Sequence, residues 1–293
     1  MMESEHLQHP CLRQVDILPV RMDGRDLVCL QDPEKLAEEP IFLHKPVLFL
    51  LARMDGQNSL RDIQADYCRA TGDILPMEAL ESLVAQLDEK RYLEGPPFRA
   101  FFREITRRFR ESPSRLVFHA GSAYPADPEI LRSRIRDYFM SPDGPGEAPR
   151  SENLEPLRGL VAPHIDFARG GSAYAHAYAA LRARPKADTF VIFGTCHAPM
   201  PRRFSISSKD YETPLGTART DGDFVARLQA RLHNEYADDF PHRAEHSIEF
   251  QAVFLKYTLG DASEFRIVPI LVNSFHDIYE KGKTAAEDPE IQE

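Results

Sequence analysis

The chain has 293 residues, of which 42% are hydrophobic and 28% charged, a composition that fits a globular protein with one large domain or two ordinary ones. Its formal net charge of −10 argues against general binding to nucleic acid, which requires clustered Lys and Arg side chains. No apolar run approaches the roughly 20 residues of a membrane span, and the N-terminus lacks the features of a signal peptide, so we expect a cytoplasmic protein without membrane contact.

The N-terminal part of the sequence predicts a small domain of short strands and helices. Apolar patches within residues 1–40 indicate strands or a β-hairpin. Three helical segments follow, and the second has a capping residue at Ser59 and a terminating Gly72. Residues 76–96 combine a helical apolar spacing with a short strand at their end. We therefore expect a winged-helix-like module over residues 1–97.

A winged helix can bind DNA, but the charge of this region argues against that function. Between Ile41 and Pro97 nine acidic residues outnumber six basic ones, and the third helix carries no basic stripe. The phrases "LLARMDGQNSLRDI" and "LVAQLDEKRYLEG" resemble the small peptide-binding modules of the PqqD type, which share the winged-helix shape and serve radical-SAM maturation systems. The resemblance implies a peptide or a radical-SAM protein as partner. A docking domain for another protein is the alternative.

Residues 98–115 predict an amphipathic helix that connects this module to the rest of the chain. Its apolar residues share one helical face, with arginines around the remainder: Phe98, Phe101, Phe102, Ile105 and Phe109. Such a face can lie on a membrane surface or in a calmodulin-type partner. We favour packing against the protein itself, since apolar stripes usually face a core.

From Leu116 onward the sequence alternates between buried strands and amphipathic helices. Three apolar runs have strand character, at residues 157–167, 189–197 and 265–275. Buried strands separated by helices favour a largely parallel sheet with helices on its faces. We therefore expect residues 116–293 to form a second domain of the α/β class.

Two histidines directly follow predicted strands and form the first candidate site. His164 comes after "GLVAP", and His197 comes after "FVIFGT". Ligands of α/β sheets bind at the carboxyl ends of the strands, so both imidazoles can point into one crevice if the strands are neighbours. Two neutral imidazoles begin a site for Fe, Cu or Zn. The alternative is a structural, hydrogen-bonded role for each histidine.

Cys196 lies next to His197 and raises the alternative of nucleophilic or redox chemistry. Adjacent side chains in an extended segment point to opposite sides, which argues against a pair formed by Cys196 and His197. His164 could act as the base for Cys196 instead. A cysteine hydrolase therefore stays as a further hypothesis.

A predicted helix within residues 242–260 adds groups that can bind a metal or carry protons. His246 and Glu249 are i, i+3 neighbours on one of its faces, where such a pair supplies metal ligands or a proton shuttle. The alternative is a surface-facing helix held by salt bridges. Asp166 either orients a ligand histidine or contacts substrate, or it caps the helix that follows it.

Six motifs in this part of the chain occur in the order of a known family. They are "HAGSAYP", "VAPHIDFARGGSAYAHAY", "IFGTCHAP", "YETPLGTARTD", "EHSIEFQAVFLKY" and "IVPILVNSF". From Leu116 onward the sequence resembles the Memo family, which in bacteria includes the AmmeMemoRadiSam system protein B. Memo proteins are similar in fold to the LigB-type class III extradiol dioxygenases, non-haem Fe(II) enzymes that open catechol rings.

The resemblance implies a metal-dependent, dioxygenase-like oxidoreductase that acts with a radical-SAM partner on a small-molecule substrate. Its metal, Fe(II) or Cu, would be held by His164 of the "APH" motif and His197 of the "G-(S/T)-x-H" motif. The "EHSIE" helix lines the same pocket, which makes His246 and Glu249 catalytic candidates. The alternative is a scaffold without catalysis, which binds a peptide or partner and keeps a vestigial metal site.

The family pattern extends beyond the motifs that this sequence contains. After the "IVPILVNSF" strand the family continues with an Asp-x-x-His-type segment and later a cysteine that completes the metal ligands. This sequence ends at Glu293 without either, so we expect a fragment or a truncated domain. A sheet without its later strands would expose an apolar edge.

Overall fold

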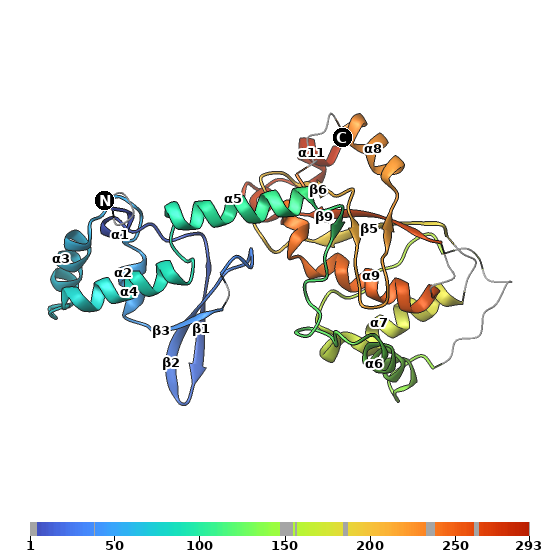
Figure 1. Cartoon of the computed structure of the whole chain (residues 1–293), viewed down its shortest axis with the longest axis horizontal. Helices are drawn as coiled ribbons and strands as arrows, with labels where there is room; N and C mark the ends of the chain where they lie inside the picture. The colour runs from blue at the N-terminus through green and yellow to red at the C-terminus, as the bar shows by residue number, and fades with distance from the viewer. Residues whose placement is uncertain are drawn as a thin grey trace. The chain divides into compact units, whose positions relative to one another are not determined.

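The computed structural model describes residues 5–37, 39–146, 155, 157–183, 187–232, 238–260 and 264–292. The chain forms two compact units, Met1–Arg108 and Phe109–Glu293 (Figure 1). No described helix is both long and apolar enough to cross a membrane.

Unit 1 contains a three-stranded antiparallel sheet in the order β1 (Asp16–Met22), β2 (Arg25–Gln31) and β3 (Ile41–His44). The turn between β1 and β2 has positive φ at Asp23 and Gly24, the conformation of a two-residue hairpin turn that matches the twist of the strands. The predicted N-terminal hairpin is therefore confirmed.

Four helices complete the core of unit 1: α1 (Glu5–Gln8), α2 (Val47–Leu51), α3 (Leu60–Thr71) and α4 (Met77–Glu89). The Ser59 hydroxyl accepts the backbone N–H of Asp62, and Gly72 ends α3 with φ 77°, so both predicted ends of this helix are confirmed. The predicted strand after α4 is wrong, because only an isolated bridge joins Leu93 to Leu12. The assignment to the winged-helix class stays a prediction.

Helix α5 (Pro96–Glu111) covers most of the segment that the sequence predicts as a connector, and the division between the units falls inside it. Its aromatic side chains pack against the protein itself. The Arg13 guanidinium lies 4.1 Å from the Phe98 ring centroid in unit 1, and Phe109 meets Phe240 edge to face in unit 2. These contacts favour the core-facing interpretation of the helix over the membrane-surface alternative.

The main sheet of unit 2 has the order β5 (Thr189–Thr195), β9 (Arg266–Val272) and β6 (Phe204–Ile206). Strands β5 and β9 are parallel, β6 is antiparallel to β9, and the short β8 (Arg219–Thr220) runs parallel to β9. The strands β4 (Ser114–Arg115) and β7 (Asp210–Tyr211) form a separate parallel pair. The predicted α/β class with a mostly parallel sheet is confirmed.

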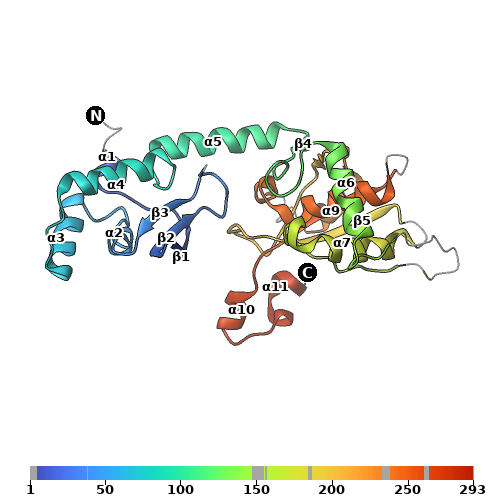
Figure 2. The same ribbon diagram turned by 90° about the horizontal axis from the view of Figure 1, so that it is seen from below.

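Helices cover both faces of this sheet, as Figures 1 and 2 show. Ile267 and Leu271 of β9 point into a core shared with α6 (Pro128–Met140), α7 (Phe167–Arg182) and α9 (His246–Leu259). Val268 and Ile270 point the other way, toward α8 (Gly222–Arg231). Because both faces of β9 are buried, its sequence is a continuous apolar run.

Short helical segments complete unit 2. The 3-10 helix η1 (Phe240–Arg243) lies directly before α9. The chain continues after β9 through α10 (His276–Glu280), η2 (Ala285–Glu287) and α11 (Pro289–Gln292). Figure 2 shows these C-terminal elements together at one side of the unit. They are held there by the Arg203 guanidinium, which pairs with Asp277 and Asp288.

The predicted strand at residues 157–167 is wrong. Its described residues before α7 form no strand, and Val161 is 96% exposed. An apolar run does not specify a pairing partner, and Pro163 lacks the N–H that a strand would donate. Without this strand, β5 is an edge strand of the sheet among the described residues, and its Phe193 side chain is 66% exposed.

Gly194 lets the start of α9 lie directly against β5. A Cβ atom at position 194 would lie 2.5 Å from Cγ1 of Ile248 and 2.6 Å from Oγ of Ser247, closer than side chains approach. Ser247 also donates its hydroxyl to the Thr195 carbonyl at 2.8 Å. The end of β5 and the first turn of α9 are therefore held together.

We expect Gly194→Ala to lower the free energy of unfolding of unit 2 by about 1–3 kcal/mol, because the added methyl group forces α9 away from β5. Gly222→Ala is the matched control, since a Cβ there meets nothing within 4 Å. This control should be neutral or slightly stabilising. Denaturant unfolding measures both, and equal losses in the two variants would contradict the close-approach argument.

Candidate metal centre

Side chains from three separate segments bring imidazole groups together in unit 2. His164 precedes α7, His197 follows β5, and His246 is the first residue of α9. One ligand atom from each lies within 4.8 Å of the others. The ring centroids are 5.3 Å apart for His164 and His197, and 4.7 Å apart for His197 and His246. Within the described ranges this is the one cluster of at least three such ligand groups.

The sequence prediction placed His164 and His197 in a shared crevice, and the structure brings both to the same cluster. The two residues reach it differently. His197 follows the end of β5 as expected, whereas His164 lies in the irregular segment before α7. His246 joins them as a third potential ligand, the first of the two roles predicted for this helix.

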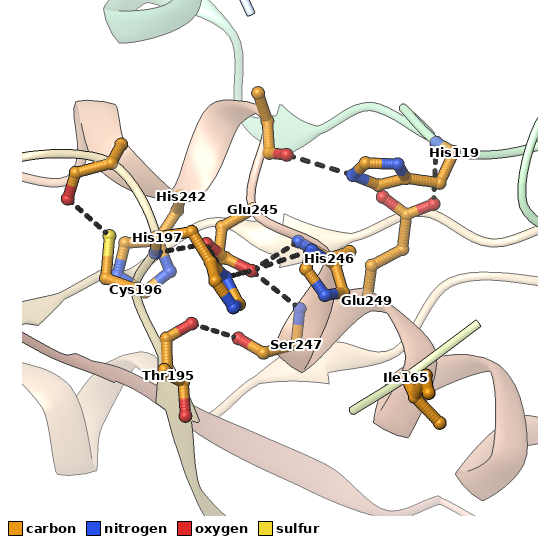
Figure 3. A network of polar contacts seen from close by, with 12 residues as sticks. His119, Ile165, Thr195, Cys196, His197, His242, Glu245, His246, Ser247 and Glu249 are labelled. Atoms are coloured by element: carbon orange, nitrogen blue, oxygen red, sulfur yellow. Dashed lines mark hydrogen bonds and ion pairs between the residues drawn. The ribbon is translucent and has the colours of Figure 1, made fainter. Parts of the chain in front are cut away.

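Glu245 is the residue that links the cluster, and Figure 3 shows its carboxylate between His197 and His246. Both Glu245 oxygens lie near Nδ1 of His197, at 3.1 and 3.2 Å. One oxygen lies 3.1 Å from Nδ1 of His246. The same carboxylate accepts the backbone N–H groups of His197, His246 and Ser247, the last two as the N-cap of α9.

These contacts set the charges in the cluster. Burial opposes ionisation of Glu245, but hydrogen bonds from the His197 side chain and from backbone N–H groups outweigh it and lower the Glu245 pKa to about 2. Burial also lowers the pKa of His246 against the attraction of Glu245, with help from the neighbouring imidazoles. A neutral imidazole keeps the lone pair that a metal ligand needs.

A buried ion pair holds the helix that carries His246 and the segment just before it. Arg115 of β4 pairs with Glu249 of α9, and both side chains are completely buried. The Arg115 guanidinium also donates to the carbonyls of His242 at 3.0 Å and Glu245 at 2.9 Å. Arg115 therefore ties the chain before α9 to a strand that lies far away in the sequence.

Glu249 does not occupy the position that the sequence predicted for a proton shuttle. Besides Arg115, its carboxylate accepts the backbone N–H groups of Phe118 and His119 and the hydroxyl of Tyr124. These contacts are structural. The alternative of a surface-facing helix held by salt bridges is also wrong, because α9 is buried along most of its length.

Asp166 takes the second of its two predicted roles. Its carboxylate accepts the backbone N–H of Arg169 as the N-cap of α7 and also pairs with the Arg169 guanidinium. Asp166 therefore positions the helix that follows His164, and none of its contacts is with an imidazole of the cluster.

Cys196 faces the apolar core, whereas the neighbouring His197 side chain is 45% exposed. The thiol donates to the Ala198 carbonyl at 3.4 Å. Burial, strengthened by the charge of Glu245, raises the pKa of Cys196 to about 12, so the thiol stays protonated at neutral pH. A nucleophilic cysteine requires the opposite shift, and the geometry gives the hydrolase hypothesis no support.

Sequence reasoning missed Glu245, Arg115 and His119. The His119 ring meets the His246 ring with centroids 5.7 Å apart, and its Nε2 lies 2.9 Å from the Ala244 carbonyl. Both Glu245 and His119 lie inside family motifs, "EHSIE" and "HAGSAYP". The signal for Glu245 was its place directly before a helix, where a carboxylate can cap.

Comparison with known proteins points to one family. The family model described as Memo-like protein matches residues 115–287. A MEMO1 family protein of Aquifex aeolicus (strain VF5) is 30% identical over 265 residues, which cover 90% of this chain and 66% of that protein. A MEMO1 family protein of Methanopyrus kandleri is 35% identical over 161 residues, covering 54% of this chain and 56% of the relative. The chain thus spans 56% to 66% of the length of these two relatives.

His242 gives the region a pH dependence that can be measured. It is fully buried between the Tyr211 hydroxyl at its Nδ1 and the Ser205 carbonyl at its Nε2, and burial lowers its pKa from 6.5 to about 4. The unfolded chain takes up this proton near pH 6.5, so stability is lost as pH falls from about 6.5 to about 4.

As pH falls through this window, we expect the free energy of unfolding to decrease in wild type more than in His242→Gln. The difference should be on the order of 3 kcal/mol. Glutamine cannot take up the proton, which removes this contribution to the slope. Urea unfolding at several pH values measures the difference. Parallel pH profiles for the two proteins would show that His242 is not buried in its neutral form.

Proposed function

Because this chain belongs to the Memo family, we propose that it binds a transition-metal ion at His164, His197 and His246 and acts as a metal-dependent, dioxygenase-like oxidoreductase. The observation that carries the proposal is the convergence of one ligand atom from each histidine to within 4.8 Å. Imidazole nitrogens suit Fe and Cu, the metals that the family resemblance implies.

The donor set fits such an ion. Metal–nitrogen bonds are about 2.1 Å long, so two nitrogens on one ion can be at most about 4.2 Å apart. The ligand atoms of the three histidines lie within 4.8 Å of one another, and small side-chain movements would bring them into this range. His164 and His197 are exposed and can make these movements, while His246 is anchored at the start of α9. The bound ion would supply Lewis-acid and redox chemistry at positions that the histidines leave open.

The protein's own residues have separate tasks in this proposal. The histidines hold the ion, Glu245 holds two of the histidines, and the Arg115–Glu249 pair fixes the helix that carries them. The exposed side of His164 and His197 leaves room for a small-molecule substrate. Glu249 and Asp166 act as structural groups here, because their contacts tie them to Arg115 and Arg169.

We expect His164→Ala, His197→Ala and His246→Ala each to lose most of the bound iron or copper. Removing one of three ligands leaves a site that holds a metal weakly. Metal analysis of the purified proteins after loading with Fe(II) or Cu measures the loss.

His176→Ala is the matched control, since the ring of this exposed histidine of α7 lies 3.0 Å from the Asp143 carbonyl and is not part of the cluster. It should keep the wild-type metal content. Unchanged metal in all three cluster variants would remove the proposed function.

A second candidate function is the binding of a peptide or a radical-SAM partner by unit 1. The observation that favours it is a pair of exposed apolar side chains, Leu18 and Phe42, on one face of the three-stranded sheet. Paired residues of neighbouring strands lie on the same face, which aligns Leu18, Cys29 and Phe42. Leu18 and Phe42 are exposed, and β1 is an edge strand that can pair with an added strand.

We expect the charged substitutions Leu18→Glu and Phe42→Glu in the full chain to abolish co-purification with a radical-SAM partner protein. Burying an unpaired carboxylate in an apolar interface costs too much free energy for the complex to form. Ile74→Glu is the control, since Ile74 is 89% exposed and lies between α3 and α4. A radical-SAM partner retained equally by all variants would exclude this face as its binding site.

A further inference from the structure

We propose that Glu245 is a positioning residue that fixes the tautomers of His197 and His246, so that both present a lone pair on Nε2 to a metal ion. This inference rests on the proposed metal site and names a residue that the site requires besides its ligands. It is drawn from the contacts of one carboxylate with two imidazoles (Figure 3).

The first step concerns the ionisation state of the Glu245 carboxylate. It is buried, and it accepts three backbone N–H groups, from His197 at 2.9 Å, His246 at 2.8 Å and Ser247 at 3.0 Å. A buried carboxylate with three N–H donors is held as the anion, which can accept hydrogen bonds but cannot donate them.

The second step follows from the ring atoms that this anion contacts. Nδ1 of His197 lies 3.1 Å from one Glu245 oxygen, and Nδ1 of His246 lies 3.1 Å from the other. Because the anion only accepts, Nδ1 of His197 donates its proton to the carboxylate in this hydrogen bond. The lone pair of a deprotonated Nδ1 on His246 would face the same negative charge at 3.1 Å, which favours a proton on this atom too. In a neutral imidazole this leaves Nε2 deprotonated, and Nε2 is then the only ring atom of each that can bind a metal.

His164 provides the contrast inside the same cluster. Its ring packs against those of His197 and His246, with centroids 5.3 and 5.9 Å apart. Among the described residues no carboxylate contacts it. The tautomers of His197 and His246 are therefore fixed before any metal binds, whereas the tautomer of His164 is free to change. Carboxylate partners of metal-binding histidines commonly act in this way, by fixing ring orientation and tautomer.

The test uses Glu245→Gln in the full chain, because an amide of the same shape has one acceptor and one donor group. The amide oxygen can replace only one of the two carboxylate oxygens, and both of these positions lie near Nδ1 of His197, at 3.1 and 3.2 Å. In either orientation the NH2 group therefore lies next to this Nδ1 and favours its deprotonated form. We expect one of the two imidazoles to change to the Nε2–H tautomer. Nitrogen-15 NMR of the imidazoles in the metal-free protein at neutral pH measures this directly.

The second readout is the affinity for Zn²⁺, a redox-inactive probe, measured by competition with a coloured chelator. We expect Glu245→Gln to raise the Zn²⁺ Kd about 10- to 100-fold. The matched control is Asp221→Asn, which makes the same acid-to-amide change at the N-cap of α8. The control should keep both tautomers and the wild-type Kd, because it makes the same change of charge at a helix N-cap outside the cluster.

Two outcomes would overturn the inference: Nδ1–H tautomers on both rings in Glu245→Gln, or a Zn²⁺ Kd equal to that of wild type. If this variant does not fold, Glu245→Ser replaces it, because serine can still cap α9 but has no carboxylate. Unchanged tautomers together with an unchanged Kd in that variant would overturn the inference equally. A wild-type protein that binds no metal would instead remove the proposed function. The NMR comparison would still decide the role of Glu245, because it needs no metal.

Discussion

The candidate metal centre depends on a single buried charge interaction, the pair of Arg115 and Glu249. A buried ion pair is stable only when its remaining donors and acceptors are satisfied, and here they are used to organise the chain. The guanidinium binds the carbonyls of His242 and Glu245, which fixes the backbone just before α9. The carboxylate of Glu245 can therefore point at the imidazoles with little freedom to turn away.

Two glutamates at the start of α9 illustrate how position decides the role of a side chain. Glu245 stands at the N-cap and turns its carboxylate toward His197 and His246. Glu249, one helical turn later, is enclosed by Arg115 and Tyr124. Both are buried carboxylates, yet one contacts the clustered imidazoles while the other anchors the helix. Spacing along the helix could not separate these roles, because their partners come from other parts of the chain.

Local patterns in the sequence predicted those features whose causes are themselves local. The hairpin of unit 1, the cap at Ser59 and the apolar run of β9 each depend on neighbouring residues, and the structure contains them. The convergence of His164 and His197 was predicted from a general rule about strand ends. The rule holds for His197, whereas His164 reaches the cluster from an irregular segment. The strand predicted around residues 157–167 failed, because pairing depends on a neighbour that the segment itself does not specify. Glu245 and Arg115 were missed for the same reason, since Arg115 and Glu249 are 134 positions apart.

That separation also has a consequence for the order in which the protein can be assembled during synthesis. Unit 1 is compact by itself, and domains generally fold as units from the N-terminus onward, so it can fold while the rest of the chain is still being made. Unit 2 cannot complete its interior in the same way, because Arg115 must wait for Glu249 to leave the ribosome. Non-local contacts of this kind slow folding, so chaperones would meet unit 2 with its sheet still open.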